Sequence, residues 1–327
     1  MEPVLDVNHL SLALPAKKGM VSILHDVSIK VEAGKILGLV GESGSGKSMT
    51  AFAITRLLSS GGHEKIGGSI RFCGEELTKK TEKEMQKIRG RDISMIFQEP
   101  MTCLNPVFTI GRQMTDVILV HQKVSKKEAY QIAKDILESV HIRNAEDVLA
   151  CYPYELSGGM RQRVMIGIAL SCRPKLLIAD EPTTALDVTV QTKILYLIKE
   201  ACQKLGTAVI FISHDLGVIS QICDTIAVMY SGHIVEYGEE QDVFSHPEHP
   251  YTKALMAAVP KFTVKEGEKL FAIPGMVPDP SEKMEGCRFA PRCPYATDIC
   301  HTMMPVDQVA GNGHLVYCHN WKKAVKA

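Results

Sequence analysis

The chain of 327 residues is long enough for two compact domains, or for one large domain with an appendage. Its 45% hydrophobic and 23% charged residues are typical of a globular protein. Lys plus Arg and Asp plus Glu both number 37, and this balance argues against a general nucleic-acid binder and against a polybasic membrane anchor. No window holds the roughly 18 uninterrupted apolar residues of a membrane-spanning helix, so we expect any membrane role to be peripheral.

The N-terminal sequence MEPVLDVNHL has acids and a proline where a secretory signal needs a basic start and an apolar stretch, which predicts a cytosolic chain. Apolar or alternating segments then predict strands at 4–14, 21–31, 35–40, 68–73, 175–180 and 207–213. The pattern between about 82 and 172 is mostly helical, and a further helical stretch lies near 188–204. This order predicts an α/β core interrupted by a helical insertion.

The residues GESGSGKS (41–48) fit the pattern G-x-x-x-x-G-K-[ST] and lie between a predicted strand and a predicted helix. Backbone N–H groups of such a loop converge on phosphates, while Lys47 reaches the terminal phosphates and Ser48 ligates Mg²⁺. The loop therefore predicts a nucleotide site. Its candidate binding residues are Gly41, Glu42, Ser43, Gly44, Ser45, Gly46, Lys47, Ser48 and Met49.

An acid pair follows the apolar run in LLIADEP. We expect Asp180 to lie beside the phosphate loop and to hold the Mg²⁺ shell, and Glu181 to polarise an attacking water. An ordinary solvated strand end would also explain a single Asp-Glu pair, but it does not explain the other motifs.

The segment LSGGMRQR (156–163) places Ser157, Gly158 and Gly159 at a predicted helix start, which indicates a second anion site. Together these stretches resemble the ATP-binding cassette (ABC) ATPases, a P-loop NTPase family in which such a segment completes the active site of an opposing subunit. The resemblance covers residues 1 to about 245, with a helical subdomain at about 90–172. It includes Gln98 in IFQEP, Asp187 in TTALD and His214 in FISHD.

The resemblance implies a role for each matching residue. Gln98 would sense the γ-phosphate and Mg²⁺ and relay to a membrane partner, and Asp187 would line the dimer seam. A lone histidine after a strand is usually structural, but His214 comes 33 residues after Glu181 and ends the next apolar strand, which favours a catalytic role. The implied catalytic residues are thus Glu181, His214 and Lys47, and the implied Mg²⁺ ligands are Ser48, Gln98 and Asp180.

The chain departs from the family pattern at two places. Met160 stands where many members have glutamine. No aromatic residue precedes Phe52, so the ring that usually stacks on adenine is missing, and we expect Leu12 or Leu14 to supply an apolar face instead.

The stretches LSGGMRQRVMIGIAL, DEPTTALDVTVQ and HPYTKAL closely resemble the peptide/nickel importer subfamily. The resemblance implies an ATPase subunit at the cytoplasmic face of the membrane. Its partners would be a second ATPase that is a different chain, two membrane permeases and an extracytoplasmic substrate-binding protein. Residues 97–114 would contact a permease helix. A soluble ABC ATPase acting in DNA repair, on ribosomes or in cluster assembly is the alternative, although the neutral charge argues against nucleic acid.

Residues 246–327 form a predicted irregular extension, rich in Pro, Gly and Cys. Six other cysteines are scattered singly, as small buried hydrophobes would be, whereas four follow the spacing C-x5-C-x6-C-x17-C. Four thiolates suit either Zn²⁺ or an iron–sulfur cluster, and idle thiols are a third reading. His301, His314 or His319 could replace one ligand. The resemblance implies a [4Fe-4S] cluster on Cys287, Cys293, Cys300 and Cys318, with no evident part in hydrolysis.

Overall fold

The computed structural model describes residues 2–17, 19–58, 62–98, 103–183, 188–259, 271–311 and 313–324. The chain divides into two compact units. Unit 1 comprises Met1–Leu5, Val31–Ile36 and Phe72–Ile212, and unit 2 comprises Asp6–Lys30, Leu37–Arg71 and Ser213–Ala327.

Unit 1 combines parallel strands with a group of helices. Its strands run in the order β8-β7-β6, with β6 at Ile93–Ile96, β7 at Leu176–Asp180 and β8 at Ala208–Ser213. All residues of β7 and β8 are buried, as expected for central parallel strands. The short β5 is Glu75–Glu76. The helices are α2 (Glu82–Ile88), α4 (Ile110–His121), α5 (Lys126–Ser139), α6 (Ala145–Ala150), η1 (Pro153–Glu155), α7 (Gly158–Leu170) and α8 (Val188–Leu205).

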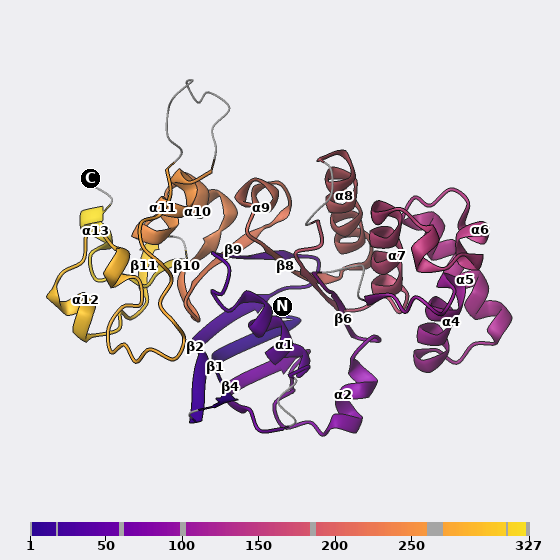
Figure 1. Ribbon diagram of the computed structural model, residues 1–327, viewed down its shortest axis with the longest axis horizontal. Coiled ribbons are helices and arrows are strands. Elements are labelled where there is room, and N and C mark those ends of the chain that lie inside the picture. Colours follow the sequence, from indigo (N-terminus) through magenta and orange to yellow (C-terminus); the bar gives the residue numbers. More distant parts are fainter. Residues whose placement is uncertain are drawn as a thin grey trace. The chain divides into compact units, whose positions relative to one another are not determined.

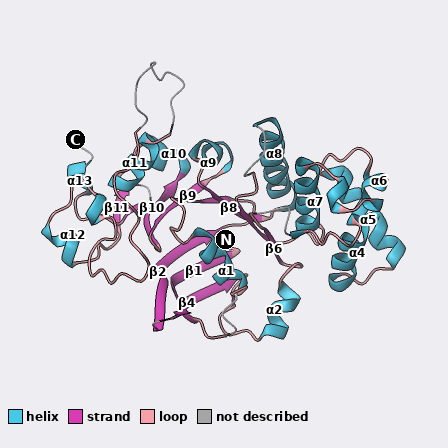
Figure 2. Cartoon of the chain, in the orientation of Figure 1, coloured by secondary structure: helices cyan, strands magenta, loops and turns pink. Residues whose placement is uncertain are grey.

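Helices α4 to α7 lie together in Figures 1 and 2 and form the predicted helical insertion. Their starts follow local capping chemistry. Ser125 and Glu128 form a reciprocal capping box at α5, with the Ser125 N–H donating to the Glu128 carboxylate over 2.7 Å. Thr81 and Glu84 do the same at α2.

Unit 2 contains two sheets. One has the order β2-β1-β4, with β1 at Leu5–Ala16, β2 at Gly19–Val31 and β4 at Lys65–Phe72. The other has the order β11-β12-β10-β9-β3. Its strands are β3 (Ile36–Val40), β9 (Thr225–Tyr230), β10 (His233–Glu239), β11 (Gln308–Gly311) and β12 (His314–Val316). The helices are α1 (Lys47–Thr55), α9 (Leu216–Ile222), α10 (Glu240–Ser245), α11 (Pro250–Ala257), η2 (Ala290–Arg292), α12 (Asp298–Thr302) and α13 (Trp321–Ala324).

The hairpin between β9 and β10 turns at Ser231 and Gly232, which both have positive φ, 44° and 81°. Two such residues suit the tight hairpin turns that match the twist of antiparallel strands. A Cβ on Gly232 would lie 2.2 Å from the Ile23 carbonyl oxygen, so glycine is required. The turn also meets the phosphate loop, because the Gly232 N–H donates to the Ser45 carbonyl over 2.8 Å.

The strands predicted from apolar patterns are confirmed, but the described residues hold six further strands that were missed, β5, β6, β9, β10, β11 and β12. β6 lies inside the segment expected to be helical, and it is only four residues long. The turn between β9 and β10 contains a single glycine, Gly232, which is a weak hairpin signal in the sequence. The scattered cysteines are a second difference: of the six, only Cys202 is buried, and Cys73 and Cys103 are exposed.

The C-terminal extension is not wholly irregular, because β12 pairs with β10 in antiparallel register, Glu236 with Val316 and Tyr237 with Leu315. The fully buried Glu236 carboxylate lies 2.7 Å from the His314 ring nitrogen. It also accepts hydrogen bonds from the N–H groups of Glu248 (2.7 Å) and His249 (2.9 Å). One buried charge therefore ties three segments of unit 2 together.

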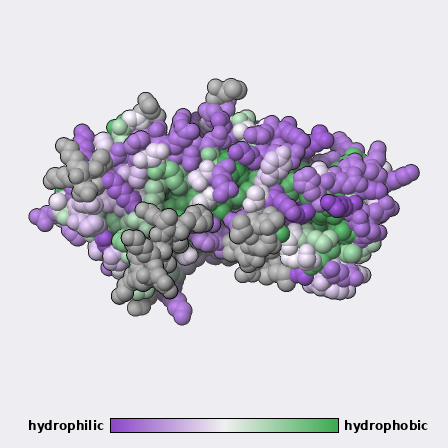
Figure 3. All heavy atoms as spheres, turned by 90° about the horizontal axis from the view of Figure 1, so that it is seen from above, coloured by the Kyte–Doolittle hydropathy of each residue, from purple (hydrophilic) through white to green (hydrophobic). Residues whose placement is uncertain are grey.

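Among the helices of the described ranges, none combines the length and the apolar composition needed to cross a bilayer. On the face drawn in Figure 3, hydrophilic residues cover most of the surface.

The Glu236 carboxylate raises the pKa of His314 above its ordinary value of 6.5. A raised folded-state pKa means that the pair stabilises the fold fully below pH 6.5, and that this contribution is lost as the pH rises through the folded value. We expect His314→Gln to lower the free energy of unfolding by about 3 kcal/mol below pH 6.5, and by less in alkaline solution. Denaturant unfolding across pH measures this, with the exposed His63→Gln as control. An equal loss at every pH would contradict the ion pair.

Candidate functional site

The phosphate loop of unit 2 links the buried strand β3 to helix α1. Gly41 has φ 151°, and a Cβ there would lie 2.1 Å from the Met229 carbonyl oxygen, so only glycine fits against β9. Gly46 caps α1 with φ 106°, and no described side chain hydrogen-bonds to this cap. The first N–H groups of α1 are therefore presented as an anion-binding helix start.

Lys47 is folded back over the loop that precedes it. Its side chain is buried, and Nζ donates to the carbonyl oxygens of Gly41 (2.7 Å) and Glu42 (3.0 Å) and lies 3.4 Å from Ser45 Oγ. A bound phosphate can replace these carbonyl contacts of the lysine. Ser48 and Met49, on the first turn of α1, are half-buried.

The acid pair of unit 1 lies at the end of β7. Asp180 is the last strand residue and is buried. Glu181 leaves the strand with φ 47°, the left-handed region that non-glycine residues rarely adopt, and its N–H donates to the Ile212 carbonyl over 3.0 Å. Strained backbone of this kind is often found at functional positions.

Gln98 follows β6 and contacts this acid. Its Nε2 donates to Glu181 Oε2 over 2.9 Å. The parallel pairing of β6 with β7 explains the contact, because it brings their carboxyl ends to the same edge. Two residues predicted separately from motifs 83 positions apart are thus brought together.

The segment LSGGMRQR forms the start of α7. Ser157 caps the helix, its Oγ accepting from the Met160 N–H over 3.4 Å. Gly158 is exposed, and a Cβ there would meet no described atom within 4 Å. The chain's own packing thus leaves room for a side chain at Gly158.

Gln162 is a residue that the motif reasoning missed. It is buried on α7, and its Nε2 donates to the carbonyl oxygen of Pro182, directly after Glu181. The bond ties the start of α7 to the turn that carries the acid. The sequence shows Gln162 as a polar residue inside LSGGMRQR. Its hydrogen bond to the Pro182 carbonyl oxygen could not be inferred from that motif.

A protein-family model described as "ABC transporter" matches residues 24–184, and one described as "Oligopeptide/dipeptide transporter, C-terminal region" matches residues 235–300. The chain is 49% identical over 320 residues to the oligopeptide transport ATP-binding protein AppD of Bacillus subtilis, covering 97% of each chain. The chain belongs to the ABC transporter family of ATP-binding proteins.

Two further comparisons agree with this membership. The cassette is 48% identical over 317 residues to the probable D,D-dipeptide transport ATP-binding protein DdpD of Escherichia coli, covering 97% of this chain and 96% of the relative. A solved dimeric ATP-binding cassette, in a post-hydrolysis state bound to ADP and Pi, superposes with a TM-score of 0.65 at 24% identity, covering 72% of this chain and 98% of that one, and shows the shared fold. The general activity of the family is ATP hydrolysis.

Four other predicted residues of the cassette are His214, Asp187, Leu12 and Leu14. His214 is exposed and directly follows β8, and the next residue, Asp215, caps α9 by accepting from the Gly217 N–H over 2.9 Å. Asp187 lies outside the described residues. Leu12 is fully buried, so it cannot offer a face to adenine, whereas Leu14 is half-buried.

The four tail cysteines line one small cavity of about 10 Å³, together with His319 and Asn320. Burial raises the pKa of the Cys287 thiol to about 11 and that of Cys318 to about 12. Within the described ranges, however, no three His, Cys, Asp or Glu side chains come together closely enough to hold a metal ion. The structure therefore does not support the predicted [4Fe-4S] site.

The alternative histidine ligands of the tail have other surroundings. His314 is paired with Glu236, and His319 Nε2 lies 3.0 Å from the Met303 carbonyl oxygen. His301 is exposed on α12.

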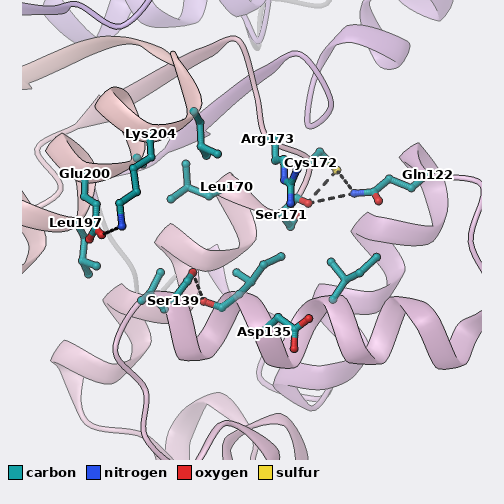
Figure 4. A pocket seen from close by; sticks show the side chains of 15 residues that line it. Gln122, Asp135, Ser139, Leu170, Ser171, Cys172, Arg173, Leu197, Glu200 and Lys204 are labelled. Carbon is teal, nitrogen blue, oxygen red and sulfur yellow. Dashed lines mark hydrogen bonds and ion pairs between the residues drawn. The ribbon is translucent and has the colours of Figure 1, made fainter.

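A separate cavity of about 660 Å³ in unit 1 lies among α4, α5, the end of α7 and α8 (Figure 4). Polar groups of its wall already contact one another. Gln122 Nε2 donates to the Ser171 carbonyl over 3.1 Å, and Lys204 pairs with Glu200. The lining comes from α5, α7 and α8 and from the residues that directly follow α4, α5 and α7, rather than from the motif loops.

We expect Glu181→Gln to leave ATP binding intact and to slow hydrolysis by roughly 10²–10⁴-fold, because the amide cannot polarise a water but can still meet Gln98. Steady-state phosphate release and nucleotide binding measure the two effects. Glu146→Gln, which alters a surface ion pair with Lys134, serves as control. Near-normal turnover of Glu181→Gln in the assembled complex would refute the assignment.

Proposed function

We propose that the chain is the ATP-hydrolysing subunit of an importer for dipeptides or oligopeptides, or for related small solutes such as nickel. The observation that carries this proposal is the near full-length similarity to ATP-binding proteins named for oligopeptide and dipeptide transport. The match of residues 235–300 with a family model described as the C-terminal region of oligopeptide/dipeptide transporters supports it. Residues 1–245 would form the ATPase domain and 246–327 the extension.

Within this proposal the phosphate loop, Gly41 to Met49, binds the phosphates of ATP. Lys47 would exchange its carbonyl contacts for the terminal phosphates, and Ser48, Gln98 and Asp180 would hold Mg²⁺, which neutralises phosphate charge. The support is the open start of α1 and the loop-bound lysine in unit 2.

The hydrolytic step is assigned to the acid of unit 1. Glu181 would accept a proton from the attacking water, with Gln98 orienting its carboxylate, and His214 would contact the γ-phosphate. The 2.9 Å hydrogen bond between Gln98 and Glu181 supports this division of roles. A change in the contacts of Gln98 would directly change the orientation of the Glu181 carboxylate.

Ser157, Gly158, Gly159 and Asp187 are proposed to serve the nucleotide of a second ATPase subunit. The unobstructed space at Gly158 and the exposed start of α7 support this for the first three. The second subunit would be a different chain.

Two membrane permeases are the proposed partners in the bilayer, with an extracytoplasmic binding protein acting through them, and the chain would lie on the cytoplasmic face. The segment 97–114 is the proposed contact. In its described part Val107 is 68% exposed, while Leu104 is buried. The exposed rings of Tyr152 and Tyr154 stack with their centroids 5.5 Å apart. They follow Cys151, whose carbonyl oxygen accepts a hydrogen bond from the Ile110 N–H within segment 97–114.

Purification tests transport against a soluble ABC ATPase of repair, ribosome or cluster-assembly type. We expect the tagged chain, extracted in detergent, to carry two membrane permeases, and Val107→Asp to weaken this association by placing a charge in an apolar contact. Val309→Asp, an equally exposed position on β11, is the control. A complex of purely soluble proteins would favour the alternative.

We further propose that Cys287, Cys293, Cys300 and Cys318 bind a metal group, a [4Fe-4S] cluster in preference to Zn²⁺. Their support is that all four line one cavity and that sulfur is the donor both groups prefer. Asn320 already donates to Cys300 Sγ over 3.4 Å, a contact of the kind that stabilises a ligating sulfur.

Metal analysis of protein purified without air tests the cysteine proposal. We expect iron, with the visible absorbance of an iron–sulfur cluster, and loss of both in Cys293→Ser. Cys172→Ser, a half-buried cysteine of unit 1, is the matched control. Finding one zinc and no iron would show that the site holds zinc instead of a cluster. The absence of both metals would overturn the proposal.

A further inference from the structure

The C-terminal extension contacts the phosphate loop directly. Arg292 and Glu42 form a two-pronged ion pair, with NH1 2.7 Å from one carboxylate oxygen and NH2 3.1 Å from the other. Paired, parallel bonds of this kind specify orientation as well as charge. The two residues are 250 positions apart, and Glu42 is the second residue of GESGSGKS.

A second contact holds the backbone of the same residue. The Glu42 N–H donates to the hydroxyl of Tyr251 over 2.8 Å. Tyr251 is fully buried and packs against the rings of Tyr230 (4.7 Å) and Phe289 (5.4 Å). Burial raises the pKa of Tyr251, so the hydroxyl stays neutral. The loop backbone is thus anchored to a rigid aromatic cluster.

The third contact of Glu42 is with the lysine of the phosphate loop. The Glu42 carbonyl accepts from Lys47 Nζ over 3.0 Å. Side chain, N–H and carbonyl of one residue therefore connect Arg292, Tyr251 and Lys47. Any displacement of Glu42 alters the carbonyl that holds the lysine.

Arg292 is itself held in place. Its side chain is 3% exposed, and Nε donates to the Pro274 carbonyl over 2.8 Å while NH2 donates to that of Ile273 over 3.3 Å. A buried guanidinium that loses its carboxylate partner is strongly unfavourable, so the pair with Glu42 persists. The pair also neutralises an acid that would otherwise repel an anionic nucleotide.

The turn that carries Arg292 lies between two of the tail cysteines. The Ala290 N–H donates to the Cys287 carbonyl over 3.0 Å, and the Cys293 N–H donates to the Ala290 carbonyl over 3.2 Å. The Cys287 N–H in turn donates to the Cys300 carbonyl over 2.8 Å. The fold of the cysteine loop therefore determines where Arg292 is presented.

We propose that the C-terminal extension positions the phosphate loop, with Arg292 and Tyr251 as positioning residues for ATP, so that the integrity of the cysteine loop sets nucleotide affinity. This rests on the proposed role of the phosphate loop. It reverses the expectation that the cysteine tail is unconnected to the ATP chemistry. Disordering the cysteine loop withdraws Arg292, leaves the Glu42 charge uncompensated and releases the carbonyl that holds Lys47.

Equilibrium binding of ATP to the full-length chain tests the proposal through a double-mutant cycle. We expect Arg292→Ala to raise the Kd for ATP by roughly tenfold or more, the usual effect of losing a charged hydrogen bond. Arg292→Lys keeps the charge without the two-pronged geometry and should lie between. Glu42→Gln should weaken binding less, and the double variant should match Glu42→Gln, because removing the acid removes what Arg292 acts upon.

Controls separate this inference from a general loss of stability and from failure of the proposed site. Lys134→Ala removes an ion pair of similar length with Glu146 and should leave the Kd unchanged. Circular dichroism confirms folding, and if Arg292→Ala does not fold, Tyr251→Phe, which removes only the hydroxyl, decides by the same rise in Kd. Lys47→Ala should abolish binding.

Three outcomes are decisive: two would overturn the positioning role, and one would overturn the phosphate site itself. If Lys47→Ala abolishes binding while folded Arg292→Ala and Tyr251→Phe bind ATP as the unmodified chain does, the positioning role is wrong and the phosphate site stands. Additive effects of Arg292→Ala and Glu42→Gln would also refute action through Glu42. If Lys47→Ala binds ATP normally, the proposed site itself is wrong.

Discussion

The arrangement of unit 2 depends on the contacts of the buried Glu236 carboxylate. The carboxylate has no exposed surface. It contacts the ring of His314 from β12 and accepts hydrogen bonds from two backbone N–H groups of the residues that lead into α11. A buried charge is tolerated only when its hydrogen-bonding capacity is filled. Filling it at Glu236 brings the extension and the start of α11 to the same strand, and α11 carries Tyr251 to the phosphate loop.

The phosphate loop is consequently held on two sides by parts of the chain remote in sequence. Gly41 fits against the carbonyl of Met229 because it has no Cβ. Glu42 donates its N–H to the Tyr251 hydroxyl and forms an ion pair with Arg292. In unit 1 the proposed catalytic acid is held in a comparable way, since Gln162 on α7 donates to the Pro182 carbonyl oxygen, directly after Glu181. Each unit thus fixes its motif residue through a neighbouring helix or turn rather than through the motif alone.

Much of the fold and of the candidate site could be predicted from local patterns. Glycines, a lysine and acids at fixed spacing identify phosphate chemistry, because backbone N–H groups and a strand end create it locally. Strand β6 and the hairpin of β9 and β10 were missed, since short apolar runs also suit helices and their pairing is nonlocal. The exposure of Leu12 was misjudged for a different reason, because the alternation of a strand does not say which of its faces is buried.

The sequence by itself determined that this chain binds a nucleoside triphosphate, that it belongs with the ABC ATPases and that its last residues carry a distinct cysteine pattern. These properties depend on residues close together in the chain. Only the tertiary structure decided that Gln98 meets Glu181, that Glu236 docks the extension and that Arg292 reaches Glu42. The physical reason is that a hydrogen bond between residues 83 or 250 positions apart depends on how strands pair and pack, which no local spacing encodes.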